Sequence, residues 1–95
     1  MSEHTPGPWI GKKTGSGGQG LIYSEKDGRN VAVIYDERDI PLIESAPKLL
    51  AVCKCALADL EGIMPEFEPG GDRKHPAWTT IRELWAAIGQ AEGRA

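Results

Sequence analysis

Two hydrophobic patterns divide the chain. Over residues 8–36, short apolar runs alternate with turn-forming residues, which is typical of β-strands joined by tight turns. After residue 39, apolar residues recur every three or four positions, which is typical of amphipathic helices. The order of the two patterns predicts an α+β fold, a small antiparallel β meander of about three strands followed by and packed against an α-helical hairpin.

Within the meander, residues 8–36, the sequence predicts a hairpin. Asp27 and Gly28 separate two apolar runs and supply the positive φ of a tight turn. Because residues 31–35 are all apolar, we expect them to form a central strand whose two faces are covered by a helix or a second subunit.

The first helix is predicted over residues 39–63. Asp39 is its candidate N-cap, and Pro41 is tolerated in a first helical turn. Pro47 either kinks this helix or separates two helices, the second capped by Ser45. The apolar stripe consists of Ala46, Leu49, Leu50, Cys53, Ala56, Leu57 and Leu60.

A loop and a last helix complete the predicted hairpin. Residues 65–76 hold three of the seven prolines and a glycine pair, which predicts a loop. Residues 76–92 predict a helix, because apolar side chains again share one face. These are Trp78, Ile81, Trp85 and Ile88. With 40% hydrophobic and 26% charged residues, residues 1–95 are expected to form a single domain.

Length and charge narrow the function classes. A chain of 95 residues is only modestly stable unless a partner subunit covers an apolar face, which favours a homo-oligomer, a dimer or higher. A net charge of −3 disfavours nucleic-acid binding, which needs a basic face. No apolar run approaches the roughly 20 residues of a membrane helix, and the start lacks signal-peptide features, so we expect a cytoplasmic protein with no membrane partner.

The reactive side chains predict no enzyme, cofactor or metal site. Cys53 and Cys55 project about 200° apart on a helix, so they cannot form a disulfide, and no histidine neighbours them. Cys53 is expected in the core. His4 and His75 lie in predicted coil without a partner, and His75 is expected to precede or cap a helix. Acidic residues in the loop are interpreted as a solvated surface: Glu66, Glu68 and Asp72.

The glycine-rich stretch at residues 15–20 matches GxGxxG but lacks the context of a nucleotide site. A strand-like run follows it, whereas a Rossmann fingerprint opens a helix. A kinase glycine loop does lie between strands, but Tyr35 occupies the place of the kinase lysine. A flexible hairpin loop is therefore favoured over a phosphate cradle.

Three tryptophans supply much of the apolar area of this small chain. Trp78 and Trp85 share one helical face and either pack against the first helix, which is favoured, or form a dimer seam. Trp9 follows a rigid proline-rich segment, and its expected role is to anchor the meander.

Three segments resemble a widespread group of small phage and prophage proteins. They are HTPGPW at residues 4–9, APKLL at residues 46–50 and the alanine-rich end at residues 86–93. The chain departs from the group at residues 39–41, where an Asn/Ala-rich stretch is expected, and in its long proline–glycine loop. The resemblance implies a location in the host bacterial cytoplasm, and an accessory protein that occupies a host protein or sequesters a host nucleotide signal.

Three hypotheses follow. The first is a non-catalytic phage accessory protein that binds a host or phage protein, for example in counter-defence. Its interface residues would be Val31, Val33, Tyr35, Trp78 and Trp85. The second is an oligomeric sponge for a nucleotide, with ligand-binding residues His4, Trp9, Lys12, Lys13, Gly15, Gly17 and Gly20. The third and weakest, nucleic-acid binding, rests on two basic pairs, at residues 12–13 and 73–74, and the aromatic residues.

Overall fold

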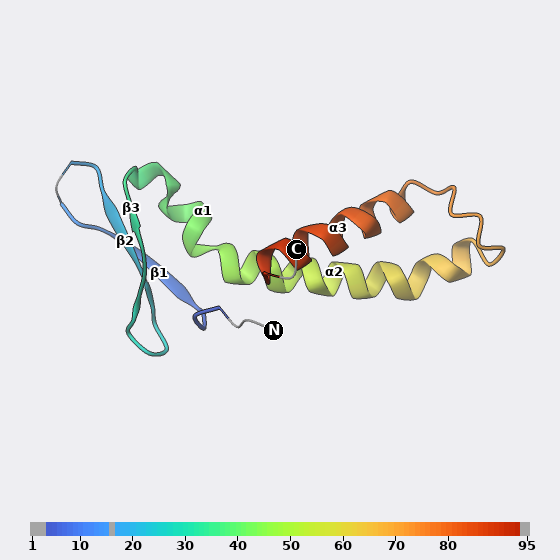
Figure 1. The fold of residues 1–95 in the computed structure, drawn as a ribbon, viewed down its shortest axis with the longest axis horizontal. Helices are drawn as coiled ribbons and strands as arrows, with labels where there is room; N and C mark the ends of the chain where they lie inside the picture. Colours follow the sequence, from blue (N-terminus) through green and yellow to red (C-terminus); the bar gives the residue numbers. More distant parts are fainter. Residues whose placement is uncertain (1–3, 16, 94–95) are drawn as a thin grey trace. The chain divides into compact units, whose positions relative to one another are not determined.

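The computed structural model describes residues 4–15 and 17–93. Its elements are β1 (Trp9–Lys13), β2 (Gly20–Ser24), β3 (Asn30–Ile34), the 3-10 helix η1 (Glu37–Asp39), α1 (Ile40–Glu44), α2 (Ala46–Phe67) and α3 (Ala77–Ala91) (Figure 1). The predicted α+β fold, a three-stranded antiparallel sheet followed by a helical hairpin, is confirmed. Contacts group into two units, His4–Leu49 and the chain from Leu50 onward, each with its own apolar cluster.

The sheet has the order β1-β2-β3, so the central strand is β2 and the prediction of a central strand at residues 31–35 is wrong. Two consecutive hairpins lay the strands side by side in chain order, which leaves β3 paired on one side only. Val33 is accordingly 60% exposed, and Tyr35, just beyond β3, is 80% exposed. The apolar run of β3 therefore has a covered face and an open face.

Helix α1 covers one face of the sheet at two glycines. Gly11 in β1 and Gly20 in β2 lack side chains, and a Cβ at either position would clash with Ile40 of α1. Ile40 instead packs with Ile22, which is fully buried, and Ile34. Next to this contact, the Gly11 N–H donates to the Glu44 carboxylate at 2.8 Å.

The predicted hairpin at residues 27–28 is confirmed. Gly28 has a φ of 74°, and the Arg29 N–H donates to the Asp27 carboxylate at 3.1 Å. Ahead of β1, the N-terminal segment is held by side chains of the sheet. Ser24 donates its hydroxyl to the Pro6 carbonyl at 2.7 Å, and the Trp9 indole donates to the Thr5 carbonyl at 3.0 Å. Trp9 thus anchors the meander, as the sequence predicts.

The first helical segment begins at Ile40 as expected, but the predicted caps differ. Asp39 makes no side-chain cap bond; the Asp36 carboxylate accepts the Arg38 N–H instead and caps η1. Ser45 does not cap the following helix, because its hydroxyl donates back to the Pro41 carbonyl at 2.7 Å. Short polar side chains have several backbone partners in reach, and the turn geometry decides among them.

The predicted break near Pro47 takes the form of two helices. α1 ends at Glu44 and α2 begins at Ala46, so Pro47 lies in the first turn of α2, where its missing N–H costs nothing. At the other end, α2 runs through Pro65 to Phe67, whereas the sequence predicts a loop from residue 65. The loop proper spans residues 68–76.

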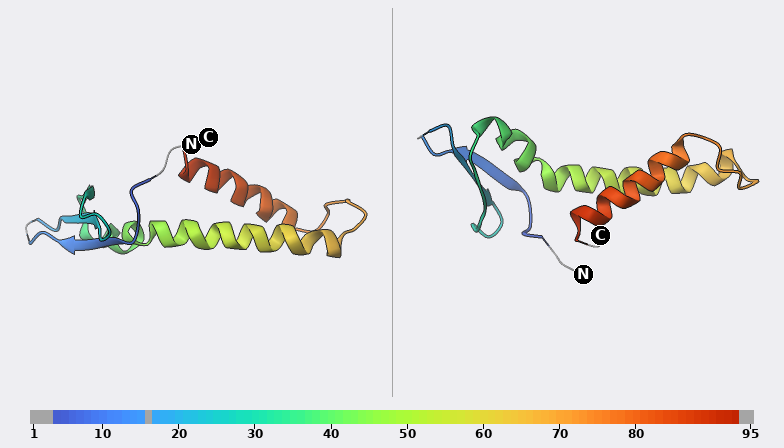
Figure 2. Two further views of the ribbon diagram at one scale, coloured as in Figure 1. Left: turned by 90° about the horizontal axis from the view of Figure 1, so that it is seen from below. Right: turned by 45° about the horizontal axis from the view of Figure 1, so that its top comes forward.

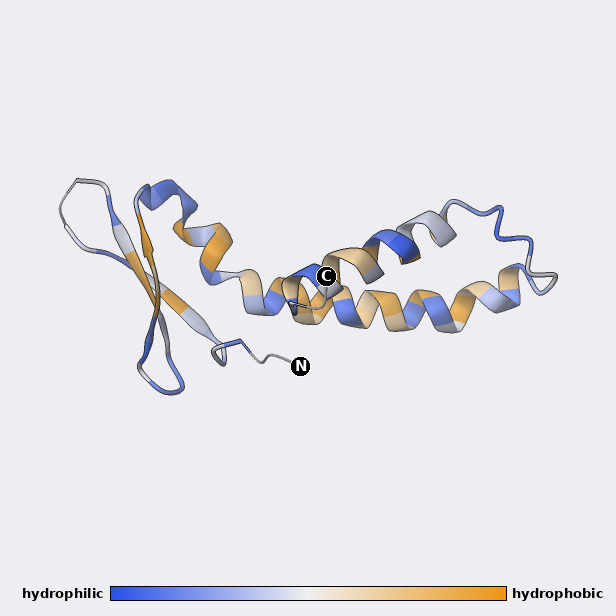
Figure 3. Cartoon of the chain, viewed as in Figure 1, coloured by the Kyte–Doolittle hydropathy of each residue, from blue (hydrophilic) through white to orange (hydrophobic). Residues whose placement is uncertain are grey.

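The helical hairpin has its own apolar core. Its buried members, from both helices, are Leu57, Met64, Ile81 and Ile88. In the hydropathy colouring of Figure 3, hydrophobic and hydrophilic stretches alternate along α2 and α3. The two helices diverge toward the end of α3 (Figure 2, left). There Lys54 of α2 forms an ion pair of 2.6 Å with Glu92. Cys53 packs against the core as predicted, whereas Cys55 is exposed.

Candidate functional site

The residues of the predicted nucleotide site are spread along β1 and the turn that follows it. The His4 and Trp9 rings meet edge to face, 6.2 Å between centroids. Lys12 and Lys13 are exposed at the far end of β1, and Lys13 Nζ lies 3.9 Å from the Glu37 carboxylate. Because Trp9 and Lys13 stand at opposite ends of a five-residue strand, about 13 Å apart at 3.3 Å per residue, the Trp9 ring does not reach the glycine turn.

The glycines of that turn have different environments. Gly15 and Gly17 adopt positive φ values of 85° and 63° and have open space where a side chain would stand. Gly20 is buried beneath Ile40 as the first residue of β2. The structure therefore brings together His4 with Trp9, and Lys13 with the turn, but not the whole predicted set.

The sheet face opposite α1 is apolar, and we call it the open sheet face. The register places Ile10 opposite Tyr23, and Leu21 opposite Val33, on this side. Val33 is 60% exposed, whereas Ile10, Leu21 and Tyr23 are half-buried. Of the other two predicted interface residues in β3 or just after it, Val31 packs against the core and Tyr35 projects into solvent.

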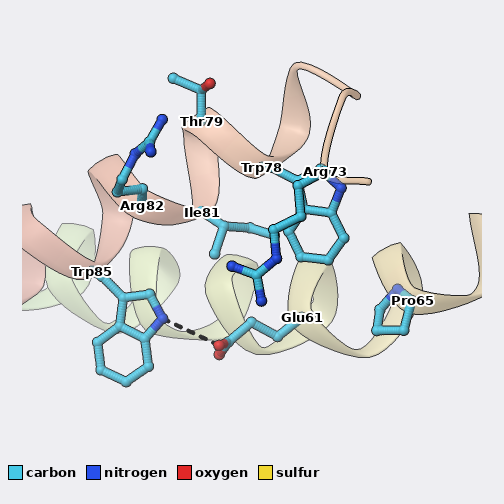
Figure 4. Close-up of a pocket in the computed structure, with 8 residues that line it drawn as sticks. All are labelled: Glu61, Pro65, Arg73, Trp78, Thr79, Ile81, Arg82 and Trp85. Carbon is cyan, nitrogen blue, oxygen red and sulfur yellow. Dashed lines mark hydrogen bonds between the residues drawn. The ribbon is translucent and has the colours of Figure 1, made fainter. Parts of the chain in front are cut away.

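The helical hairpin contains a pocket of about 480 Å³ between α2, the loop and α3 (Figure 4). Two tryptophans and two arginines dominate its lining. The lining residues are Glu61, Pro65, Arg73, Trp78, Thr79, Ile81, Arg82 and Trp85. Trp78 also packs against the hairpin core, as the sequence favours, whereas Trp85 stays 50% exposed.

Glu68 holds the loop end of this pocket in place. Its carboxylate accepts hydrogen bonds from the Lys74 N–H at 2.9 Å, the His75 N–H, and the Trp78 indole at 3.0 Å. Desolvation opposes the charged carboxylate, but the hydrogen bonds from Trp78, Lys74 and His75 outweigh it and lower the pKa of Glu68. The prediction that Glu68 is merely solvated surface is therefore wrong.

His75 and Arg73 complete the loop geometry. The His75 ring accepts the Ala77 N–H at 3.0 Å, which matches the expectation that His75 precedes or caps the last helix. The Arg73 guanidinium lies 5.0 Å from the centroid of the Trp78 ring. At the other side of the pocket, the Trp85 indole donates to the Glu61 carboxylate at 3.1 Å, the bond drawn in Figure 4.

The sequence prediction included Trp78 and Trp85 as interface residues and Arg73 in the nucleic-acid hypothesis, but neither Glu61 nor Arg82. Arg82 could have been found, because it lies four positions after Trp78 and three before Trp85 on one helix. Glu61 and Arg73 come from a different helix and from the loop. No local spacing signals their approach.

Within the described residues, no helix is long and apolar enough to cross a membrane. Comparison with curated proteins and with solved structures finds no significant match to either. A family model, Salmonella phage P22 protein Y8K6, matches residues 1–95. Because this match spans the whole sequence, the chain belongs to the phage protein family of Salmonella phage P22 protein Y8K6.

Proposed function

We propose that this protein is a non-catalytic phage accessory protein that binds a host or phage protein through its open sheet face. The observation that carries the proposal is the asymmetry of the sheet. Helix α1 packs on one face through Ile40, whereas the other face carries Ile10, Leu21, Tyr23 and Val33, of which Val33 is 60% exposed.

An antiparallel sheet with one solvated face normally alternates apolar and polar side chains. Here the outward positions are apolar except Lys12 and Asn30, so the open sheet face is more apolar than a solvated sheet face normally is. Val33 and Tyr35 extend this surface at the β3 edge, with 60% and 80% of their area exposed. Membership of a phage protein family supports a role in the host cell, and counter-defence is one such role.

The histidine environments support a binding role over a catalytic one. The His4 ring contacts the Thr5 carbonyl at 3.0 Å, and the His75 ring accepts the Ala77 N–H. Each is engaged by the local backbone, whereas a general base needs a nucleophile or substrate proton in reach.

The test is site-specific photo-crosslinking in the bacterial host. A photoreactive phenylalanine analogue replaces Val33 in one variant and Lys26, an exposed residue of the β2–β3 turn, in the matched control. We expect a discrete covalent adduct from position 33 but not from position 26, and loss of the adduct when excess unlabelled wild-type protein competes. Excess Val33→Asp protein should compete poorly, because a buried aspartate in an apolar interface is costly.

The mass of the adduct distinguishes the occupants. An adduct with a host or phage protein supports the proposal, whereas one of twice the chain mass assigns the face to a homo-oligomer instead. Absence of any discrete adduct at position 33, or the same adducts from both positions, would refute the proposed binding face.

A nucleotide sponge at the glycine turn is the second candidate. It is favoured by the open backbone at Gly15 and Gly17 and by the exposed side chain of Lys12, which forms no ion pair with the residues that the structure describes. It predicts thermal stabilisation by nucleotides that Lys12→Gln weakens, since a ligand that binds only the folded state raises the melting temperature. No shift across a panel of cyclic and linear nucleotides would exclude it.

A further inference from the structure

We infer that the pocket of the helical hairpin binds a small ligand in which an anionic group is attached to a planar ring. The pocket lies wholly in the chain after Leu50, whereas the open sheet face lies in the His4–Leu49 unit. The inference is therefore independent of the proposed function. It rests on the conformation of Arg73, the charge of the lining and the aromatic walls.

Arg73 adopts a conformation that arginine rarely takes. Its φ of 54° lies in the left-handed region. Among the described residues, no other non-glycine residue has a positive φ. Side chains with a Cβ are strained there, and such strain is concentrated at functional sites. This backbone carries the guanidinium over the Trp78 ring and into the pocket lining.

The two arginines are not neutralised by the protein. Among the ion pairs of the described residues, none involves Arg73 or Arg82. Arg82 and Thr79 both line the pocket, and in Figure 4 the Arg82 side chain runs toward Thr79, whose hydroxyl adds a hydrogen-bond donor. Guanidinium groups without a carboxylate partner are the usual receptors for phosphate and carboxylate groups.

The acidic residues near the pocket are already engaged. Glu61 accepts the Trp85 indole at 3.1 Å, and Glu68, behind Trp78, accepts three donors. The lining itself holds two arginines and one glutamate, a local excess of positive charge on a chain of net charge −3. Because Glu68 lies behind Trp78, the guanidinium hydrogen-bond donors rather than the overall field are what an anion would bind.

The aromatic walls and the size specify the rest of the ligand. Trp85 is half exposed, so a face of its indole is accessible for a planar ring to stack upon. The volume of about 480 Å³ falls within the range of roughly 300–1,000 Å³ typical of small-molecule sites. A ligand whose ring stacks on Trp85 and whose anionic group binds the arginines fits the aromatic wall and the volume.

The test is a titration followed by the indole N–H signals in two-dimensional NMR of the full chain. The probes are adenosine 5′-monophosphate and 4-hydroxybenzoate. Both attach an anionic group to a planar ring, the first as a nucleotide and the second as an aromatic acid, and adenosine is the uncharged control. We expect saturable shifts of the Trp78 and Trp85 signals with at least one anionic probe, and much weaker shifts with adenosine. Trp9, in the other unit, is the internal reference and should not move.

The variants separate a binding role from a structural one. Arg73→Gly removes the guanidinium and the backbone strain together, so binding should weaken about tenfold or more without loss of thermal stability. Arg82→Gln should also weaken binding, and Glu61→Gln should strengthen it severalfold by removing the opposing charge while keeping an acceptor for Trp85. Arg29→Gln, in the sheet unit, is the matched control.

The outcomes decide the inference. Binding of either probe, weakened by both arginine substitutions and unaffected by Arg29→Gln, supports it and identifies the anion source. No saturable shift of Trp78 or Trp85 with either probe at millimolar concentration would overturn it. Equal binding by the wild type, Arg73→Gly and Arg82→Gln would overturn it as well.

Discussion

Substitution of Gly20 by alanine should destabilise the sheet unit, because helix α1 occupies the space that a Cβ would fill. The new Cβ would clash with the Ile40 Cδ1 and lie 3.0 Å from its Cγ1 and 3.1 Å from the Lys12 carbonyl oxygen. Ile40 cannot simply move aside, because the same side chain lies over Gly11 and packs with Ile22 in the core.

The expected magnitude combines two opposing effects. Overpacking of a core costs about 1–3 kcal/mol. Alanine regains about 0.5–1 kcal/mol relative to glycine, because the unfolded chain loses conformational freedom. The free energy of unfolding should therefore fall by about 0–2.5 kcal/mol in Gly20→Ala. Urea titration followed by the indole N–H signal of Trp9 reports on this unit, since Trp9 packs against its core.

The double variant with Ile40→Val tests the contact directly. Valine lacks the Cδ1 that clashes with a Cβ at position 20. Alone, Ile40→Val should cost about 0.5–1.5 kcal/mol. Combined with Gly20→Ala it should cost nothing or restore stability, which gives a coupling energy of about 1 kcal/mol. Strictly additive effects of the two substitutions would refute the packing of α1 on this glycine.

Two further predictions concern the helical hairpin. Because the folded-state pKa of Glu68 is lowered, its charged form stabilises the fold above the ordinary glutamate pKa, and this contribution is lost as pH falls through the lowered value. Glu68→Gln should thus be less stable than the wild type at pH 7, with the gap closing as the pH falls below the ordinary glutamate pKa in denaturant titrations; a constant gap would contradict this reasoning. Gly62 lies inside α2 with open space around it, so Gly62→Ala should raise the free energy of unfolding by up to about 1 kcal/mol in the same assay. Unchanged or lower stability would show that this turn of α2 is not helical in solution.

The fold elements were predictable where local preferences decide them. Asp27 and Gly28 form the expected turn, since only a residue tolerant of positive φ fits there. The three- and four-residue periodicity of α2 and α3 likewise identified the residues that meet in the hairpin core. The end of α2 was missed because Pro65 suggested a break.

The binding surfaces were only partly predictable. Val33 and Tyr35 were selected as interface residues from their apolar run, but the run was assigned to a covered central strand. Strand order depends on pairing partners rather than on the composition of one strand. The pocket shows the same limit, because Trp78 and Trp85 could be placed on one helical face whereas Arg73 and Glu61 reach them from the loop and the other helix.

By itself, the sequence determined the α+β class, the three strands, the turn at residues 27–28 and the apolar stripes of the hairpin. These features follow from backbone and burial preferences that act over a few neighbouring residues. Only the tertiary structure decided that α1 packs on Gly11 and Gly20, that one sheet face stays open, and that Arg73 lies over Trp78. Each of these depends on which faces of distant segments meet, and that choice is made by packing of the whole unit rather than by any local pattern.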